Sequence, residues 1–321
     1  MGKLLLKTAA LLLTVLLILV LLGPFVTPKW VEGHAHNGAT YLTTTTDGFF
    51  ALEENSLDVL FIGSSQILRG VDPVQLEEET GLSAYSRATT KQPISVSYYY
   101  LKNALKTQRP RMVVLDPPTM FSDYDADEDE AYVRYAFDTM PLDRDKLVSL
   151  WHTIRGSEKQ HMLDYLLPAV YYHDRLPEMD AFDWEYPFLK DKSDPHRGAI
   201  LLDDIQPQEF TPLTGNADRA EPYAESSLYW HEKIVELCEE EKIQLVMLRT
   251  PRVTWTEEMH AADAAFAEAH SIPLIDFHLE TLYNEAGLDD QTDFFDRGHL
   301  TAAGAHKLTH VLGKLIMELD K

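Results

Sequence analysis

Short runs that are apolar at every position recur along this chain, and each is followed by a turn signal. The first is Val59–Ile62, which ends at Gly63, and the second is Met112–Leu115, which ends at Asp116. A half-buried strand alternates apolar and polar residues, whereas a strand of a parallel sheet is covered on both faces and is apolar throughout. We therefore expect both runs to be buried parallel strands.

Helical segments alternate with these runs. Asp72 followed by Pro73 predicts a helix start, because Asp caps the first turn and Pro fits the first helical position, and Gly81 predicts the end of that helix. Further elements are expected as a helix over 93–106, a helix over 226–241, a strand over 245–248, a helix that a Thr254–Glu257 capping box begins, a strand over 272–277 and a helix over 301–319. This alternation predicts an α/β fold, a three-layer doubly wound parallel sheet with helices on both faces.

The chain divides into three predicted parts. Residues 1–29 form a cytoplasmic tip and a transmembrane signal anchor, residues 30–56 a polar linker, and residues 57–321 the α/β domain. From about 119 to 222 the alternation stops in a stretch rich in Asp, Tyr, Trp and Pro, which predicts a helical insertion over the sheet.

The anchor is expected over residues 8–26, which are almost purely apolar. About 19 residues at 1.5 Å each match a hydrocarbon core of about 30 Å. Lys3 and Lys7 precede the run, so the positive-inside rule places the N-terminus in the cytoplasm and the domain outside it. A cleaved signal peptide is the alternative, but its apolar core would be shorter, and no small-x-small cleavage site follows Leu22. Trp30 is expected at the outer membrane interface.

Charge and cysteine content exclude two classes of function. The chain has 28 Lys and Arg against 52 Asp and Glu, a formal charge of −24. Such a surface repels a phosphate backbone, so we expect no nucleic-acid partner. The single cysteine, Cys238, lies on an apolar helical stripe and is expected to be a small buried hydrophobe rather than a catalytic thiol.

Two motifs at opposite ends of the α/β domain carry the predicted chemistry. Gly63-Ser64-Ser65 directly follows the first strand, where a doubly wound sheet binds its ligands. Asp296-Arg297-Gly298-His299 precedes the last helix. A serine nucleophile needs a base within hydrogen-bond reach and a group that orients the base, and Asp296 with His299 supplies both.

These blocks resemble the SGNH/GDSL hydrolase superfamily, in which a Gly-Asp-Ser block follows the first strand and an Asp-x-x-His block precedes the last helix. Ser64 stands here in place of the Asp, a variant seen in the SGNH-like proteins of cell-surface acylation, such as the D-alanyl-lipoteichoic acid biosynthesis and alginate O-acetylation proteins. The resemblance covers roughly residues 57–118 and 226–319. It implies that Ser65 is the nucleophile, His299 the base and acid, and Asp296 the orienting carboxylate.

The chain departs from that superfamily at the oxyanion hole. The segment 86–93 lacks the glycine, and Leu115-Asp116-Pro117-Pro118 lacks the asparagine, that donate there. The Ser65 N–H remains one donor, and candidates for another are Thr89, Gln92 and a backbone N–H near Ala88. Candidates for contact with an anionic substrate group, or for pairing with local acids, are Arg87 and Lys91.

We expect no metal and no other cofactor. Asp125, Asp127 and Asp129 alternate as in a calcium loop, but Glu130 stands where such loops need glycine, so a solvated acidic loop is favoured. His34 and His36 form a pair without further ligands. Aromatic side chains that either line a sugar-binding face or pack the insertion are Tyr165, Tyr171, Tyr172, His173, Trp184 and Tyr186.

The sequence thus predicts a membrane-anchored, extracytoplasmic serine esterase or O-acyltransferase that acts on a cell-envelope glycan or teichoic-acid-like polymer. The resemblance implies a multi-pass membrane O-acyltransferase as partner. The alternative is an inactive accessory or binding protein with the same fold, which the missing oxyanion-hole residues favour and the intact Ser65, Asp296 and His299 oppose. A metal-dependent hydrolase ranks third, because no convincing ligand cluster is present.

Overall fold

The computed structural model describes residues 1–29, 42–117 and 120–321. Within these residues, five parallel strands form one sheet in the order β2-β1-β3-β4-β5. The strands are β1 (Val59–Ile62), β2 (Ala84–Ser86), β3 (Met112–Leu115), β4 (Gln244–Arg249) and β5 (Leu274–Asp276). The predicted α/β fold with a parallel sheet is confirmed. Strand β2 was not predicted, because three residues are too few to stand out as an apolar run.

The strand register brings the carboxyl ends of the central strands together. Ile62 of β1 pairs with Leu115 of β3, and Leu115 pairs with Met247 of β4. The residues that follow these strands therefore meet at one edge of the sheet, where α/β folds bind their ligands.

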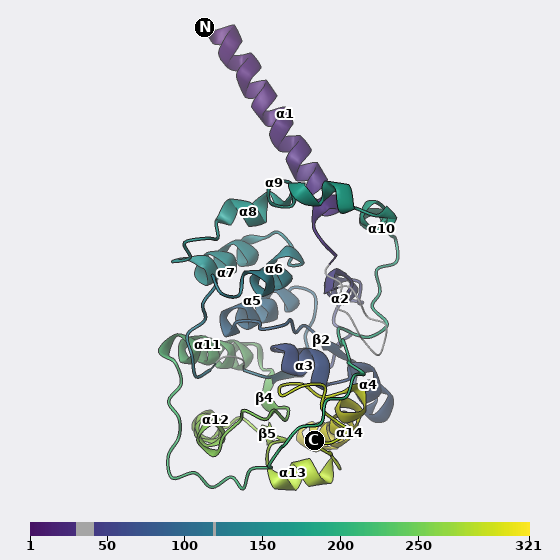
Figure 1. Cartoon of the computed structure of the whole chain (residues 1–321), viewed down its shortest axis with the longest axis vertical. Helices are drawn as coiled ribbons and strands as arrows, with labels where there is room; N and C mark the ends of the chain where they lie inside the picture. The colour runs from purple at the N-terminus through teal and green to yellow at the C-terminus, as the bar shows by residue number, and fades with distance from the viewer. Residues whose placement is uncertain (30–41, 118–119) are drawn as a thin grey trace.

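Helices cover both faces of the sheet, as Figure 1 shows. Because side chains alternate along a strand, Phe61 packs on one face and Leu60 on the other. The helices packed on the Phe61 face are α3 (Ser65–Gly70), α4 (Pro73–Thr80), α13 (Glu280–Glu285) and α14 (Ala302–Leu319). Those on the Leu60 face are α5 (Ile94–Ala104), α11 (Glu225–Glu241) and α12 (Glu257–His270), and Cys238 of α11 is buried there as predicted.

Two predicted helix starts have different outcomes. Asp72 caps α4 by accepting from the Val74 and Gln75 N–H groups, and Gly81 ends it with φ of 75°, as predicted. The predicted Thr254–Glu257 capping box is wrong, because Thr256 caps α12.

The Glu257 side chain is used elsewhere. Its carboxylate accepts from the backbone N–H groups of Thr214 and Gly215, so it reaches across to the insertion instead of back to its own helix.

The insertion contains short helices followed by an extended segment. Its helices are α6 (Glu130–Asp138), α7 (Arg144–Ile154), α8 (Met162–Leu166), α9 (Pro168–Tyr171), η1 (His173–Glu178), α10 (Ala181–Glu185) and η2 (Tyr186–Phe188). Residues 189–224 contain neither helix nor strand. This segment returns to the core, where the Ile200 N–H donates to the Leu68 carbonyl at 2.8 Å.

The N-terminal helix α1 (Gly2–Val26) is, among the described residues, the one helix long and apolar enough to cross a membrane. In Figure 1 it projects from the domain, and α8, α9 and α10 lie at its base. A further helix, α2 (Leu42–Phe50), lies within the region predicted as a linker. Trp30, His34 and His36 fall outside the described residues.

Candidate active site

The turn between β1 and α3 requires glycine at position 63. A Cβ there would lie 2.7 Å from the Asp116 carbonyl oxygen and 3.0 Å from the Asp116 Cβ. Both neighbours lie at the end of β3, and a backbone carbonyl cannot move aside as a flexible side chain can. Gly63 therefore lets the chain turn tightly against β3 and begin α3 at Ser65.

Ser64 and Ser65 have separate roles in this turn. Ser64 caps α3, because its hydroxyl oxygen accepts from the Gln66 N–H, while its proton is donated to Asp116 Oδ2 at 2.8 Å. Ser65 is the first residue of the helix, so its N–H has no carbonyl one turn behind it to accept a bond. The Ser65 hydroxyl and N–H are thus both available at the carboxyl edge of the sheet.

The structure brings the three predicted catalytic residues together. His299 Nε2 lies 2.8 Å from Ser65 Oγ, although the two residues are 234 positions apart. On the other side of the ring, His299 Nδ1 lies 2.9 Å from each Asp296 oxygen. With the proton on Nδ1, the ring donates to Asp296 and accepts the Ser65 proton. This is the hydrogen-bonding order of a Ser-His-Asp triad.

The loop before α14 holds Asp296 and His299 in position. The Phe295 N–H donates to the His299 carbonyl at 2.9 Å, and the Gly298 N–H donates to Asp296 Oδ1 at 2.7 Å. Burial acts to raise the pKa of Asp296, but the hydrogen bonds from His299 and the loop amides outweigh burial and lower that pKa. Asp296 is therefore a carboxylate at neutral pH and can orient a protonated His299.

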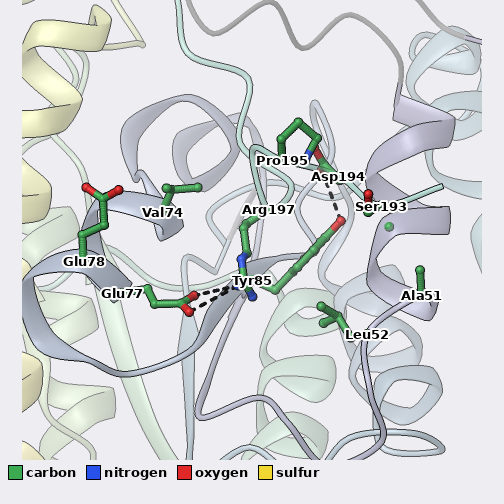
Figure 2. Close-up of a pocket in the computed structure, with 11 residues that line it drawn as sticks. Ala51, Leu52, Val74, Glu77, Glu78, Tyr85, Ser193, Asp194, Pro195 and Arg197 are labelled. Atoms are coloured by element: carbon green, nitrogen blue, oxygen red, sulfur yellow. Dashed lines mark hydrogen bonds and ion pairs between the residues drawn. The ribbon is translucent and has the colours of Figure 1, made fainter. Parts of the chain in front are cut away.

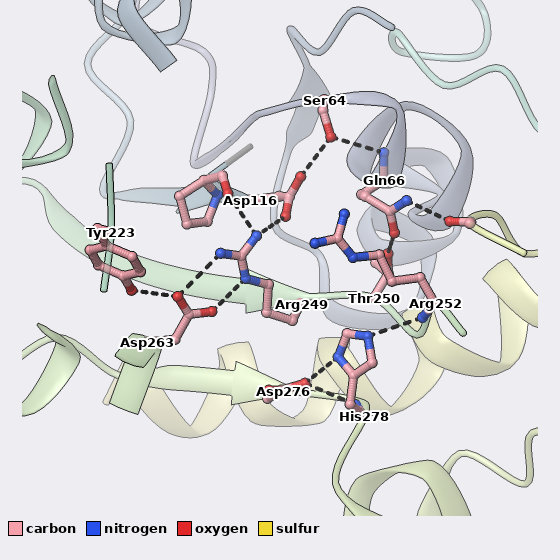
Figure 3. Close-up of polar contacts among 12 residues, drawn as sticks. Ser64, Gln66, Asp116, Tyr223, Arg249, Thr250, Arg252, Asp263, Asp276 and His278 are labelled. Carbon is pink, nitrogen blue, oxygen red and sulfur yellow. Dashed lines mark hydrogen bonds and ion pairs between the residues drawn. The ribbon is translucent and has the colours of Figure 1, made fainter. Parts of the chain in front are cut away.

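A buried ionic network lies beneath the serine turn (Figure 3). Arg249, at the end of β4, donates to Asp116 Oδ1 at 2.8 Å and to Asp263 Oδ2 at 2.6 Å. Asp263 also accepts from the Tyr223 hydroxyl. Because Asp116 in turn accepts from Ser64, the network fixes the N-terminal end of α3 through charge-assisted bonds. Arg249 and Asp263 are not among the residues predicted from the sequence, although a polar residue at the end of an apolar strand was a usable signal.

The loop after β4 joins the two halves of the triad. The Thr250 hydroxyl donates to Gln66 Oε1, and Gln66 Nε2 donates to the Gly298 carbonyl, each at 2.5 Å. The Val253 N–H donates to the Arg297 carbonyl at 2.8 Å. Gln66, next to Ser65, and the Arg297–Gly298 segment, next to His299, are thereby both bonded to the loop after β4.

Arg252, on this loop, has no ion-pair partner among the described residues. Its guanidinium lies 4.5 Å from the centre of the Trp255 ring, and Figure 3 shows the side chain pointing toward the turn that holds Ser64 and Gln66. Burial and the neighbouring Arg249 lower the pKa of Arg252 to about 10, so it is still charged at neutral pH. This position can meet an anionic group of a ligand.

The predicted oxyanion-hole candidates are buried and bonded to one another. Thr89 Oγ1 donates to Gln92 Oε1 at 2.9 Å, and Gln92 Nε2 donates to Ser97 Oγ at 3.0 Å. The Ala88 N–H points to Ser86 Oγ at 3.4 Å. These groups already have protein partners, so one of them can serve an oxyanion only by exchanging its present bond or by using the second Gln92 amide proton.

The two candidate cations on the same segment have other partners as well. Arg87 is buried, and its guanidinium lies 4.7 Å from the centres of the Phe49 and Tyr100 rings. Lys91 is exposed and pairs with Asp129 at 2.7 Å. For Lys91 the sequence left two alternatives, contact with a substrate anion or pairing with a local acid, and the structure has the second.

The insertion's candidate groups lie away from the triad. Asp127 accepts from the backbone N–H of Glu158, and Asp125 accepts from the N–H of Asp127, so the acidic residues bind protein groups. No group of three metal-ligating side chains occurs in the part of the chain that the structure describes. Three of the candidate aromatic side chains, those of Tyr165, Tyr171 and Tyr172, surround the Arg134 guanidinium.

A separate hollow of about 470 Å³ lies beside β2 (Figure 2). None of the triad residues lines it. Its Arg197 pairs with Glu77 at 3.0 Å, and the Tyr85 hydroxyl donates to the Thr45 carbonyl. Arg197 and Tyr85 therefore have partners within the protein, and the hollow holds no counterpart of the Ser65–His299 pair.

Comparisons with known proteins reveal a likeness of fold only. No family model matches the chain, and no curated protein matches it. Among solved structures it is similar to a protein described as an acylhydrolase from Bacteroides fragilis, with 10% identity, a TM-score of 0.40, and coverage of 86% of this chain and 95% of that one. It is also similar to a GDSL-like lipase from Bacteroides thetaiotaomicron, with 11% identity, a TM-score of 0.39, and coverage of 87% and 98%. Neither likeness identifies an activity, so function rests on the residues of this chain.

Proposed function

We propose that this chain is a serine hydrolase or O-acyltransferase that works through an acyl-enzyme on Ser65. The observation that carries the proposal is the unbroken chain of contacts from Ser65 Oγ to His299 Nε2 at 2.8 Å and from His299 Nδ1 to Asp296 at 2.9 Å. A serine hydroxyl is a weak nucleophile until a positioned base takes its proton.

The reaction divides into two half-reactions. In the first, His299 Nε2 takes the Ser65 proton as Oγ attacks the carbonyl carbon of an ester, and the protonated ring then gives that proton to the departing alkoxide. In the second, His299 takes a proton from water or a sugar hydroxyl as its oxygen attacks the acyl carbon. The protonated ring then gives that proton to Ser65 Oγ as the acyl–Oγ bond breaks. Asp296 stabilises the imidazolium formed in each half-reaction.

The oxyanion formed on the substrate carbonyl faces one free donor, the Ser65 N–H. Loss of a single oxyanion-hole donor costs about 10²–10³ in rate in a known protease. A modest hydrolase rate is therefore expected unless Gln92 supplies its second amide proton. This deficit also favours the alternative of an accessory protein that binds the substrate without turnover.

The proposed substrate is an acylated cell-envelope glycan or teichoic-acid-like polymer. The unpaired Arg252 supports an anionic substrate, because its side chain points toward the turn that holds Ser64 and Gln66. Transfer to a second polymer would require a donor, and the resemblance to cell-surface acylation proteins suggests a multi-pass membrane O-acyltransferase as its source. An anchor at the membrane raises the local concentration of such a partner.

The anchor is proposed to remain uncleaved, with the catalytic domain outside the cytoplasm. The end of α1 is packed against the insertion: the Phe25 and Trp184 ring centres lie 5.4 Å apart, and Arg175 Nη1 donates to the Val26 carbonyl at 3.1 Å. Removal of α1 as a signal peptide would break these contacts and expose the side chains of the insertion that α1 covers.

The test is intact-mass analysis of the full chain in detergent after exposure to a fluorophosphonate. We expect one adduct, on Ser65, that is absent in Ser65→Ala and strongly slowed in His299→Ala. The matched control is Ser193→Ala, which removes the hydroxyl of an exposed serine and leaves the turn that holds Ser65 unchanged. No adduct in a folded wild-type chain would contradict the enzyme proposal and favour the accessory protein.

A further inference from the structure

Exposed apolar side chains gather in one part of the insertion. Outside α1, such side chains are concentrated between residues 142 and 189 of the described chain. We use the name collar for residues 162–189, which contain α8, α9, η1, α10 and η2. Its large exposed apolar side chains are Leu163, Val170, Tyr171, Leu176, Trp184, Phe188 and Leu189. Two of them are largely open to solvent, Phe188 at 75% and Leu163 at 66%.

The collar is joined directly to the end of α1. The Phe25 ring centre lies 5.4 Å from that of Trp184 and 5.8 Å from that of Phe188. A Cβ on Gly23 would lie 3.7 Å from the Pro168 side chain, so α1 and α9 approach closely there. In Figure 1 the short helices spread across the base of α1 rather than continuing its direction.

The length of α1 sets where a membrane surface would fall. Residues 8–26 form the apolar part, and about 19 residues at 1.5 Å each span about 28 Å, close to a hydrocarbon thickness of about 30 Å. With Lys7 at the inner boundary, the outer boundary falls within a turn of Gly23–Val26. This is the level at which Trp184 and Phe188 contact the helix.

We propose that the collar lies on the outer surface of the membrane, with its exposed apolar side chains in the interfacial layer of the bilayer. The inference rests on the membrane anchor of the proposed function and extends it. Aromatic side chains such as Trp184 and Tyr171 favour the boundary between headgroups and acyl chains. Isolated exposed apolar residues are ordinary, but a group of them around the end of an apolar helix indicates a lipid-facing surface.

The charges of the collar define the kind of bilayer. Asp174, Glu178 and Glu185 are exposed, and the Arg175 cation is paired with Asp183 at 2.6 Å. The collar therefore offers apolar contact without the excess of lysine and arginine that attracts anionic lipids. It fits a surface of zwitterionic headgroups, and added anionic lipid should weaken its contact.

Two attachments give the domain a defined orientation. A single helix would let the domain rotate about the anchor, whereas α1 together with the collar fixes which side of the domain faces the lipid. The sheet edge that carries Ser65 is then held at a constant height above the membrane, where a polymer tethered to lipid can reach it.

The test places an environment-sensitive fluorophore at single cysteines of the full chain in nanodiscs. The positions are Leu163→Cys and Phe188→Cys in the collar, Leu13→Cys in α1, and Met317→Cys as the matched exposed apolar control. Met317 lies in α14, which Figure 1 places at the opposite end of the domain from α1. The native Cys238 is buried at 1% exposure, which protects it from labelling.

Nanodiscs of phosphatidylcholine that contain nitroxide-labelled lipid then report proximity by quenching. We expect several-fold more quenching at positions 163 and 188 than at 317, and a decrease at both collar positions when phosphatidylglycerol replaces half of the lipid. If position 13 were quenched but positions 163 and 188 were quenched no more than position 317, the proposed membrane contact of the collar would be wrong. The membrane insertion of α1 would still be supported. Absence of quenching at position 13 as well would overturn the anchor itself, independently of the Ser65 chemistry.

Discussion

At the carboxyl edge of the sheet, buried charges are neutralised inside the protein, and Arg249 alone binds two buried carboxylates. In the collar, by contrast, large apolar side chains such as Phe188 and Leu163 are left open to solvent. In the first region the buried ion pairs are completed within the fold, and Arg252 with the Ser65 N–H is left for a ligand. The second region is completed only by something that covers its apolar surface.

This difference indicates where substitutions should act. At the sheet edge, the members of the Arg249 network and of the triad hold one another, so removing one leaves a buried charge or a misplaced His299 ring. In the collar, some side chains contact α1 or the Arg134 guanidinium, whereas Phe188 and Leu163 are largely open to solvent. We therefore expect the largest effects on activity and stability at the sheet edge, and effects on membrane contact in the collar.

Asp296→Asn should have the largest effect of the substitutions that retain shape. An amide cannot hold the His299 tautomer that accepts from Ser65, and the equivalent change in a serine protease lowers kcat by about 10⁴. The measurement is kcat/KM on a p-nitrophenyl ester, with unfolding monitored in parallel. The control Asp289→Asn changes an exposed carboxylate before the same loop and should retain full activity. A decrease of only a few-fold in Asp296→Asn would show that the carboxylate does not orient the base.

Arg249→Met should destabilise the fold more than any change to an exposed ion pair. It leaves Asp116 and Asp263 buried without their cation, and such a loss costs about 3–5 kcal/mol. Lys91→Met removes the exposed pair with Asp129 and should cost at most about 1 kcal/mol. Thermal unfolding of the full chain in detergent compares the two variants. Equal shifts in Tm would contradict the distinction between a buried and an exposed ionic network.

The positions of Ser65 and His299 could be predicted because both follow from local sequence pattern. Val59–Ile62 is apolar at every residue, which predicts a buried strand. Ser65 then follows from the position at which this strand ends. Thr301 caps the last helix and thereby locates His299 in the preceding loop. Both signals lie within a few residues of the group that they locate.

The supporting network could not be predicted, because its members are distant in sequence. Arg249 meets Asp116 across 133 positions, and only the strand order β1-β3-β4 brings the two together. The contacts of Glu257 could not be predicted for the same reason. Its carboxylate binds backbone groups of the insertion more than 40 positions away instead of forming the local capping box. The collar could not be predicted either, because an apolar residue in a short helix looks the same in sequence whether it packs inside or faces lipid.

Arg252→Gln should change substrate preference more than overall activity. A hydrogen bond to a charged group contributes about 1.5–3 kcal/mol, so loss of the guanidinium should lower kcat/KM about 10- to 100-fold for an ester that carries a carboxylate or phosphate. A neutral p-nitrophenyl ester should be affected little. Arg155→Gln, an exposed arginine of the insertion, is the control. An equal decrease with charged and neutral esters would assign Arg252 to structure rather than to recognition of an anion.

The smallest effects concern two histidines whose pKa values move in opposite directions. At the sheet, the hydrogen bond from His260 to Asp276, opposed by burial, raises the pKa of His260. In the insertion, burial and the nearby Arg155 lower the pKa of His152. The stabilisation from His260 is complete below its unfolded pKa, about 6.5, and is lost as pH rises through the higher folded value. That from His152 has the opposite sign: it is present above about 6.5 and is lost as pH falls.

Thermal unfolding from pH 5 to 9 separates the two contributions. His260→Gln should reduce the loss of Tm on the alkaline side, and His152→Gln should reduce the loss on the acidic side, each relative to the wild-type chain. His173→Gln, which changes an exposed histidine of the collar, should reproduce the wild-type profile. If His260→Gln and His152→Gln changed Tm on the same side of the pH profile, the two regions would not shift the histidine pKa in opposite directions. Opposite shifts would extend the contrast between the paired sheet edge and the insertion to their response to pH.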